Sequence, residues 1–162
     1  MSNEEKAYIA GFLDGDGCIM AQLVRRKDYI YGYQVRVSMV FYQKQIHQEI
    51  LSWLKSKLQY GYIRQRNDGM TEYTIVGLKE VRRCLEILLP YLRLKKVLAR
   101  RVIALINTCP EKRKMDVKKL LRLSVLVDKT ATFNYSKKRT NTSEVVESFL
   151  KAKNLIPVET EV

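Results

Sequence analysis

The chain has 162 residues, long enough for one domain with its own core, and its 46% hydrophobic residues argue against a disordered basic tail. Its formal net charge of +13 calls for a polyanionic partner, although nucleic acid, a ribosome or a membrane surface would satisfy it. One histidine and three scattered cysteines leave no zinc site and no disulfide pattern, and no apolar run approaches the roughly 20 residues of a membrane span.

The first predicted element is a helix that begins behind Ser2. Ser2 and Glu5 form a capping-box pattern, in which each side chain satisfies a free backbone N–H of the other residue. Along this helix Ala7, Gly11 and Gly15 recur every four residues and therefore share one face. Small residues at this spacing allow close approach, so we expect the face to pack against another helix.

Beyond Gly17 the hydrophobic pattern changes from helical to alternating, which predicts two strands over residues 18–27 and 32–41. From residue 43 to residue 60 the period is helical again, and Gln43 opens this predicted helix. Its apolar stripe comprises Ile46, Ile50, Leu54 and Leu58.

A second hairpin follows, with strands over 62–66 and 72–76 and turn residues at 67–69. The rest of the chain is predicted to be helical, in segments whose limits are marked by prolines and capping residues. These segments are 78–89, 95–107, 116–132 and 142–153. The predicted fold class is α+β, in the order α-β-β-α-β-β-α-α-α.

Residues 8–17 read Tyr-Ile-Ala-Gly-Phe-Leu-Asp-Gly-Asp-Gly, so two carboxylates, Asp14 and Asp16, stand among glycines where the helix must stop. This decapeptide resembles the LAGLIDADG motif of homing endonucleases. The resemblance extends from residue 4 to about residue 150, in the branch of the family with one motif per chain. It implies a four-stranded antiparallel, saddle-shaped sheet that is backed by helices and straddles DNA.

The resemblance also implies a catalytic set. Asp16 matches the acid that binds catalytic divalent metal, with the Gly15 backbone carbonyl as a further ligand. Gln43 matches a glutamine that positions the attacking water, and Lys95 matches a lysine near the scissile phosphate. His47 stands where the family usually has arginine or lysine, so only a supporting role is expected. The implied cofactor is Mg2+ or Mn2+, whereas Ca2+ is expected to bind without supporting cleavage.

The polar face of the predicted sheet is a candidate DNA surface. Arginine and glutamine match the edges of guanine and adenine in the major groove, although a solvated sheet would alternate in the same way. The same-face residues Arg64 and Arg66 repel each other unless an anion faces them. The stretch 134–142 resembles the family's C-terminal phosphate-contacting loop, and its hydroxyls, lysines and following helix N-terminus suit backbone clamping. The candidate DNA-binding residues are Gln22, Val24, Arg26, Gln34, Arg36, Ser38, Val40, Arg64, Arg66, Glu72, Thr74, Ser136, Lys137 and Asn141.

One motif per chain supplies one acid, so a pair of Asp16 carboxylates requires two chains, which a symmetric dimer brings together. The expected partners are therefore double-stranded DNA and a second copy of the chain, with no membrane and no zinc. The resemblance predicts a single domain over 1–153 with a tail over 154–162, and an intracellular, organellar (chloroplast or mitochondrial) location. The residues expected at the dimer interface are Ala7, Ala10, Gly11 and Asp14.

The main hypothesis is a site-specific double-strand DNA endonuclease for intron homing. It would bind a long pseudo-palindromic site and hydrolyse one phosphodiester per strand across the minor groove, leaving short 3′ overhangs. The alternative is an intron RNA maturase, or another non-cutting nucleic-acid binder of the same fold. A basic ribosome-associated protein is a third reading. The joint presence of Asp16, Gln43 and Lys95 favours cutting.

Overall fold

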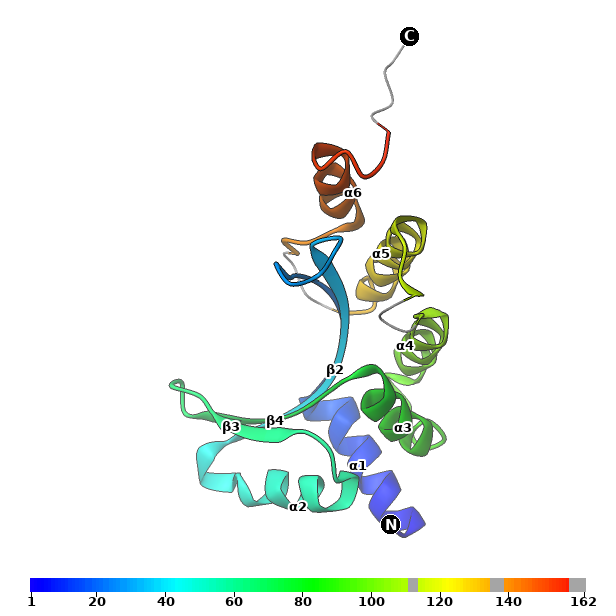
Figure 1. Ribbon diagram of the computed structural model, residues 1–162. Coiled ribbons are helices and arrows are strands. Elements are labelled where there is room, and N and C mark those ends of the chain that lie inside the picture. The colour runs from blue at the N-terminus through cyan, green and yellow to red at the C-terminus, as the bar shows by residue number, and fades with distance from the viewer. Residues whose placement is uncertain (111–113, 135–138, 158–162) are drawn as a thin grey trace. The chain divides into compact units, whose positions relative to one another are not determined.

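The computed structural model describes residues 1–110, 114–134 and 139–157 (Figure 1). Its elements, in chain order, are α1 (Asn3–Asp16), β1 (Gly17–Arg25), β2 (Tyr33–Lys44), the 3-10 helix η1 (Gln45–His47), α2 (Glu49–Leu58), β3 (Tyr62–Gln65), β4 (Met70–Val76), α3 (Leu78–Leu88), α4 (Lys96–Thr108), α5 (Val117–Ala131) and α6 (Ser143–Ala152). The α+β fold class is confirmed. The four helical segments predicted after the second hairpin correspond to α3, α4, α5 and α6, and only the written order, which ends in three helices, omits one of them.

The four strands form one sheet in the order β1-β2-β4-β3. Strand β4 pairs antiparallel with β2 on one side and with β3 on the other. In this register Tyr42, Glu72 and Arg64 lie opposite one another and form a row across one face. Phe41 and Tyr73 belong to the next row and therefore point to the other face, where their rings stack 5.7 Å apart.

The backbone contacts divide the chain into two compact units, which are described separately below. Unit 1 comprises Met1–Met20 and Val37–Ile106, and unit 2 comprises Ala21–Arg36 and Asn107–Val162. Strands β1 and β2 contribute residues to both units. The single domain over 1–153 stays a prediction.

The core of unit 1 lies between the sheet and its helices. Figure 1 shows α1, α2 and α3 on one side of β3 and β4, and α2 and α3 both contact β4. Ile9 and Leu13 of α1 are fully buried, as are Phe41 and Tyr73 of the sheet. The Tyr73 hydroxyl donates a 2.6 Å hydrogen bond to the Tyr60 carbonyl, so the buried phenol is satisfied.

The second helix begins later than the sequence predicts. Strand β2 continues through Lys44, which pairs with Met70, and Gln43 is therefore a strand residue rather than the opening of a helix. Ile46 belongs to η1 and is 79% exposed, so it is not part of the apolar stripe of α2. Pairing with β4 extends the strand, and this long-range effect outweighs the local helical period. The buried face of α2 consists of Leu51, Leu54 and Leu58.

In unit 2, helices α5 and α6 pack against each other. Leu120, Leu123 and Val127 of α5 are buried, and so are Val146 and Leu150 of α6. These residues recur at helical spacing, which places them on one face of each helix. Burial of these two faces is the main source of stability for the pair.

The three cysteines, Cys18, Cys84 and Cys109, are free thiols. Burial raises the pKa of Cys84 to about 12 and that of Cys109 to about 11, so both remain protonated near neutral pH. No helix in the described ranges is both long and apolar enough to cross a membrane.

Candidate active site

The end of α1 is set by a close backbone contact. Helix α1 begins at the predicted capping box, in which Ser2 N donates to Glu5 and Glu5 N donates to Ser2. It ends at Gly17, where a β-carbon would lie 2.6 Å from Cδ1 of Leu13 and 2.9 Å from its backbone. Only glycine lets the chain leave the helix so close to Leu13 and enter β1 at once. Asp14 and Asp16 therefore lie in the last turn of α1, directly before β1 begins.

Both oxygens of the Asp14 carboxylate accept hydrogen bonds from within the chain. It accepts hydrogen bonds from the backbone N–H groups of Arg93 (2.7 Å), Leu94 (3.2 Å) and Lys95 (2.9 Å). These residues immediately precede α4, so Asp14 caps that region from a position about 80 residues away in sequence. The Asp14 carboxylate therefore stabilises the protomer, and its expected place at the dimer interface stays a prediction.

Asp16, two residues further, has a different environment. Its side chain is exposed and makes no hydrogen bond or ion pair with any residue that the structure describes. The Lys95 ammonium group donates to the backbone carbonyl of Asp14, one of the helix-terminal carbonyls that lack an intrahelical partner. The structure thus brings Lys95 to the foot of α1 and leaves the Asp16 carboxylate available for a ligand from outside the protomer.

Two residues near this site were not singled out from the sequence. Cys18 follows the motif directly; burial raises the pKa of its thiol, while the charge of Lys95 acts in the opposite direction. Burial also raises the pKa of Tyr42, which lies close enough to Cys18 and Glu72 to sense their charges. The alternation Val40–Tyr42 in the sequence contained the signal for Tyr42, but the strand was predicted to end at residue 41.

Gln43 and His47 both belong to unit 1 and line the same hollow. They line an open hollow whose other walls include Tyr8 and Phe12 of α1 and Trp53 of α2. The Gln43 side-chain oxygen accepts the backbone N–H of Lys44 at 2.8 Å. Within the described residues, no hydrogen bond joins Gln43 or His47 to Asp16 or Lys95. The structure therefore holds Lys95 at the end of α1 through Asp14, and it places Gln43 and His47 in the lining of one hollow.

The described residues of a single protomer do not assemble a complete metal site. No cluster of three or more His, Cys, Asp or Glu side chains with suitable spacing occurs among the described residues. The hard oxygen of Asp16 suits Mg2+, but one carboxylate is too few for firm binding. This donor set is what half of a shared site would offer.

The outward face of β3 and β4 carries a network of charges. Arg64 donates to Glu72 through Nε at 3.0 Å and pairs with it through Nη2 at 2.8 Å. Arg66 lies 3.9 Å from the same carboxylate and 2.7 Å from Asp68. The repulsion between the two arginines is therefore relieved inside the chain by Glu72 and Asp68, and it does not itself demand DNA. Arg64 nevertheless keeps 65% of its side chain exposed.

The remaining candidate DNA-binding residues differ in accessibility. Gln22 and Arg26 are exposed, although Arg26 holds Asp28 through two hydrogen bonds of 2.9 and 2.8 Å. Ser38, Val40 and Thr74 are almost completely buried in the sheet, because they lie on inner strands between neighbours. Val24, Gln34, Arg36 and Asn141 are half-buried. Ser136 and Lys137 lie outside the described residues.

The small-residue face of α1 is open in the protomer. Ala7, Gly11 and Gly15 are exposed, and a β-carbon added at Gly11 or Gly15 would meet no atom within 4 Å outside its own helix. Ala10 is fully buried and packs within the protomer instead. Helical geometry explains this correction, because Ala10 lies about 100° around the helix from Gly11.

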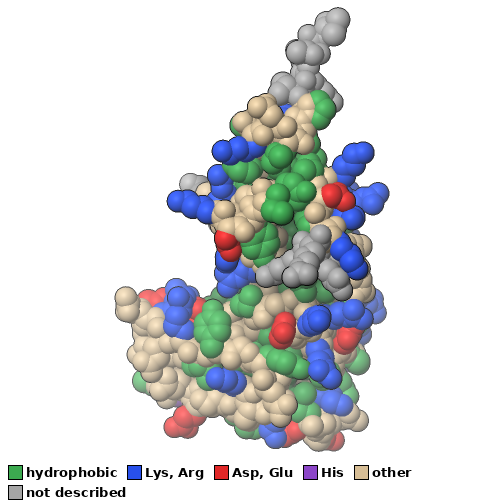
Figure 2. Space-filling model, in the orientation of Figure 1, with side chains coloured by type: hydrophobic (Ala, Val, Ile, Leu, Met, Phe, Trp, Pro, Cys, Tyr) green, Lys and Arg blue, Asp and Glu red, His purple; other side chains and the backbone are tan. Residues whose placement is uncertain are grey.

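Lysine and arginine side chains dominate the charged surface in Figure 2 and occur on both units. An α+β protein with this charge, an arginine-bearing sheet face and an available acid at a helix end is typical of proteins that process nucleic acids. The family model described as LAGLIDADG endonuclease matches residues 9–110. The chain therefore belongs to the LAGLIDADG endonuclease family.

Individual relatives agree with this assignment. The chain is 42% identical to the DNA endonuclease I-CvuI of Chlorella vulgaris over 145 residues, which cover 90% of this chain and 89% of that protein. It is 34% identical to I-CreI of Chlamydomonas reinhardtii, with coverages of 88% and 86%. A crystal structure of I-CvuI in complex with its target in the presence of Ca gives a TM-score of 0.89 and covers 95% of this chain and 97% of that one, at 40% identity.

Proposed function

We propose that this chain is a site-specific DNA endonuclease that acts as a homodimer and hydrolyses one phosphodiester in each strand with divalent metal ions. The observation that carries the proposal is the exposed Asp16 carboxylate, which has no partner among the described residues. The relatives I-CvuI and I-CreI are both named DNA endonucleases. The family resemblance further supports a long pseudo-palindromic site, 3′ overhangs and a host intron in an organelle.

The open face of α1 supports the dimer. Gly11 and Gly15 leave space for a second backbone, and a symmetric pair of α1 helices would bring the two motif ends together. Tyr8, Ile50 and Trp53 line an open apolar hollow next to this face, and Tyr8 is 52% exposed. Such apolar surface is better covered than left in water. A pair of Asp16 carboxylates would then share a site that one chain cannot complete.

The donor chemistry of the site fits Mg2+ or Mn2+. Asp16, with the Gly15 carbonyl, would provide hard oxygen ligands from each protomer, while the three thiols and the one histidine do not cluster there. A bound divalent ion would supply charge for activating water and stabilising the leaving oxygen. Ca2+ has the same oxygen preference and is expected to support DNA binding without cleavage. I-CvuI was observed with DNA both with Ca and with Mg.

Side chains of the protein itself would contact the phosphate, orient the water and recognise bases. Lys95 would present its ammonium group to the scissile phosphate, since its hydrogen bond to the Asp14 carbonyl already holds it at the foot of α1. Gln43 would orient the attacking water, with His47 beside it. Arg64 would present the guanidinium edge that Glu72 does not occupy to a guanine. Arg36 has a buried Nε atom with no partner among the described residues, which calls for a further acceptor.

The decisive experiment replaces Asp16 with asparagine. A duplex is first selected by wild-type cleavage from a randomised library. Asp16→Asn should bind this duplex with unchanged affinity in Ca2+ but cut it at least about 1,000-fold more slowly in Mg2+. Glu86→Gln is a matched control, because Glu86 is an exposed carboxylate paired with Arg82 on α3. An Asp16→Asn protein that still cuts would refute the proposal.

The same preparation separates the alternative function. An RNA maturase would bind and fold an intron RNA and would cut no duplex from the library. Incubation with intron RNA and with DNA, each with and without Mg2+, therefore distinguishes the two functions. A ribosome-associated protein would show no metal-dependent nicking of any DNA.

A further inference from the structure

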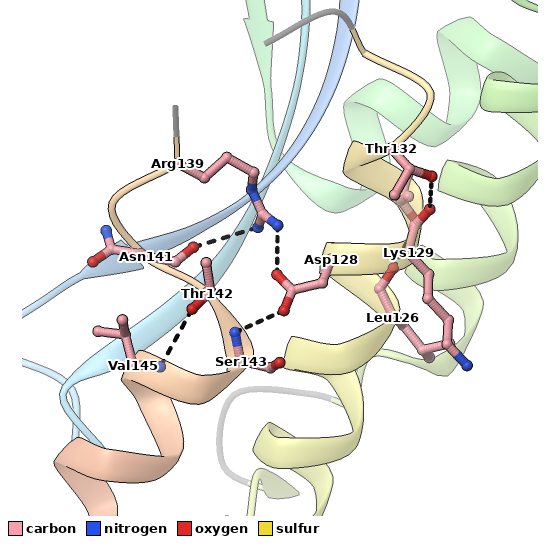
Figure 3. Close-up of polar contacts among 10 residues, drawn as sticks. Leu126, Asp128, Lys129, Thr132, Arg139, Asn141, Thr142, Ser143 and Val145 are labelled. Carbon is pink, nitrogen blue, oxygen red and sulfur yellow. Dashed lines mark hydrogen bonds and ion pairs between the residues drawn. The ribbon is translucent and has the colours of Figure 1, made fainter. Parts of the chain in front are cut away.

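The connection between α5 and α6 is the most basic one in the sequence, and Arg139, its last basic residue, is bound to an internal carboxylate. Arg139 is 24% exposed, and its Nη1 atom pairs with the Asp128 carboxylate of α5 (Figure 3). Its Nη2 atom donates to the backbone carbonyl of Asn141 at 3.4 Å. The guanidinium group is therefore bound on two sides within unit 2.

The same carboxylate also holds the start of α6. The second oxygen of Asp128 accepts the backbone N–H of Ser143 at 2.8 Å, and the Thr142 hydroxyl accepts the N–H of Val145 at 3.4 Å. Two of the N-terminal donors of α6, the N–H groups of Ser143 and Val145, are thus used by the protein itself. An internal carboxylate therefore lies at the helix N-terminus that was expected to face a DNA phosphate, and that expectation stays a prediction.

Helix α6 is attached to the β1–β2 hairpin of unit 2 by a second contact. Phe149 meets Tyr33 edge to face, with ring centres 5.4 Å apart, and the Arg25 guanidinium lies 4.0 Å from the Phe149 ring centre. Gly32 makes the fit possible, since a β-carbon there would lie 2.5 Å from the Phe149 ring. Helix α6 is therefore fixed, through Phe149, against a hairpin that carries candidate DNA-binding residues.

We propose that Asp128 and Arg139 are positioning residues for DNA binding, and that Arg139 itself contacts no phosphate. Their ion pair closes residues 139–143 onto α5 and so holds Asn141 in place. Figure 3 shows the Asn141 carboxamide pointing away from Asp128. The ion pair positions Asn141 and the residues next to it, and these residues contact the DNA backbone. This inference rests on the proposed function, because it assumes that the chain binds DNA.

The dependence of DNA affinity on salt distinguishes positioning from direct contact. Each cation that neutralises a phosphate contributes about 0.9 to the slope of log K against log salt concentration. Removal of a direct phosphate contact must therefore flatten the slope. Removal of a positioning cation weakens binding at every salt concentration and leaves the slope nearly unchanged. Asp128 adds a test of sign, because loss of a negative charge near a DNA contact should tighten binding unless the charge is needed for positioning.

The experiment measures affinity in Ca2+ at several salt concentrations, with the full-length protein and the library-selected duplex. The variants are Arg139→Met and Asp128→Asn, and Glu147→Gln is the control because Glu147 pairs with Lys151 on the outside of α6. We expect both test variants to bind about tenfold more weakly, with a slope within about 0.3 of wild type. The control should match wild type. Single-turnover cleavage at saturating protein should be unchanged in Arg139→Met, so that only binding is affected.

The inference is overturned if Arg139→Met flattens the slope by about 0.9 while Asp128→Asn binds more tightly, since Arg139 would then be a phosphate ligand. Unchanged affinity in both variants would overturn it too. If Arg139→Met does not fold, Asp128→Asn decides the matter, because tighter DNA binding by that variant would overturn the inference. Failure of the proposed function would look different, because wild type itself would then neither select nor cut a duplex.

Discussion

The end of α1 in unit 1 and the start of α6 in unit 2 both place carboxylates beside a helix terminus, but they use them differently. At α6, Asp128 is bound to Arg139 and to the Ser143 N–H. At α1, Asp14 is bound to three backbone N–H groups, whereas Asp16 has no partner among the described residues. The role of each acid is therefore indicated by its donors. An acid surrounded by internal donors stabilises the fold, and an acid without them is available for a ligand.

The largest expected effect tests the contrast between Asp14 and Asp16. Asp14→Ala leaves three backbone N–H groups without their acceptor and should lower the free energy of unfolding by about 2 kcal/mol. Asp16→Ala should change it by less than about 0.5 kcal/mol. Urea denaturation at neutral pH and matched salt measures both values. Equal losses in the two variants would contradict the division between structural and functional acids.

The next prediction concerns the open face of α1. Gly11→Ala should stabilise the protomer by up to about 1 kcal/mol, because alanine is the better helix former and its β-carbon meets no atom within 4 Å outside its helix. The same β-carbon should weaken self-association at least about tenfold if two α1 backbones meet there. Sedimentation equilibrium measures the association, and urea denaturation measures the protomer.

Gly17→Ala provides the contrast for Gly11→Ala. Its β-carbon would collide with Leu13, so the protomer should lose stability. Unaltered self-association in Gly11→Ala would mean that the dimer, if it forms, uses another surface.

A smaller effect is expected at Glu72, an acid with internal donors on the sheet face. Glu72→Gln removes the charge that holds Arg64 and Arg66, and it should cost about 1 kcal/mol, since the exposed arginines remain partly solvated. Thermal unfolding in low salt measures the loss, with Glu86→Gln expected to stay within about 0.5 kcal/mol of wild type. A larger loss of stability in Glu86→Gln than in Glu72→Gln would contradict the expectation that the more buried acid, Glu72, contributes more.

The smallest effect is a pH dependence from Asp128. Burial pushes the pKa of Asp128 upward, but hydrogen bonds from Ser143 and Arg139 outweigh it, and the net pKa lies below the ordinary value of 3.8. A depressed folded-state pKa gives stability that is present at neutral pH and is lost as the pH falls through that pKa. Wild type should therefore lose more stability than Asp128→Asn between about pH 5 and pH 3. Urea titrations across this range test the difference, and parallel curves would contradict it.

Much of the fold follows from local patterns. The capping box of Ser2 and Glu5, the end of α1 at Gly17 and the helical periods after Gly77 correspond to elements of the structure within a few residues. The prediction failed where a distant strand decides the local structure. Strand β2 extends through Gln43 because β4 supplies its hydrogen bonds, and the periodicity of residues 43–60 contains no trace of that pairing.

The sequence by itself determined the family, and it singled out Asp16 as the candidate metal ligand, since both depend on a contiguous motif that occurs once. Only the tertiary structure decided which acids are already bound. Asp14 meets its donors about 80 residues away, and Asp128 of α5 meets Arg139 in the connection that leads to α6. Sequence patterns report interactions within a turn or a strand pair, whereas the partners of a carboxylate are set by how distant segments pack.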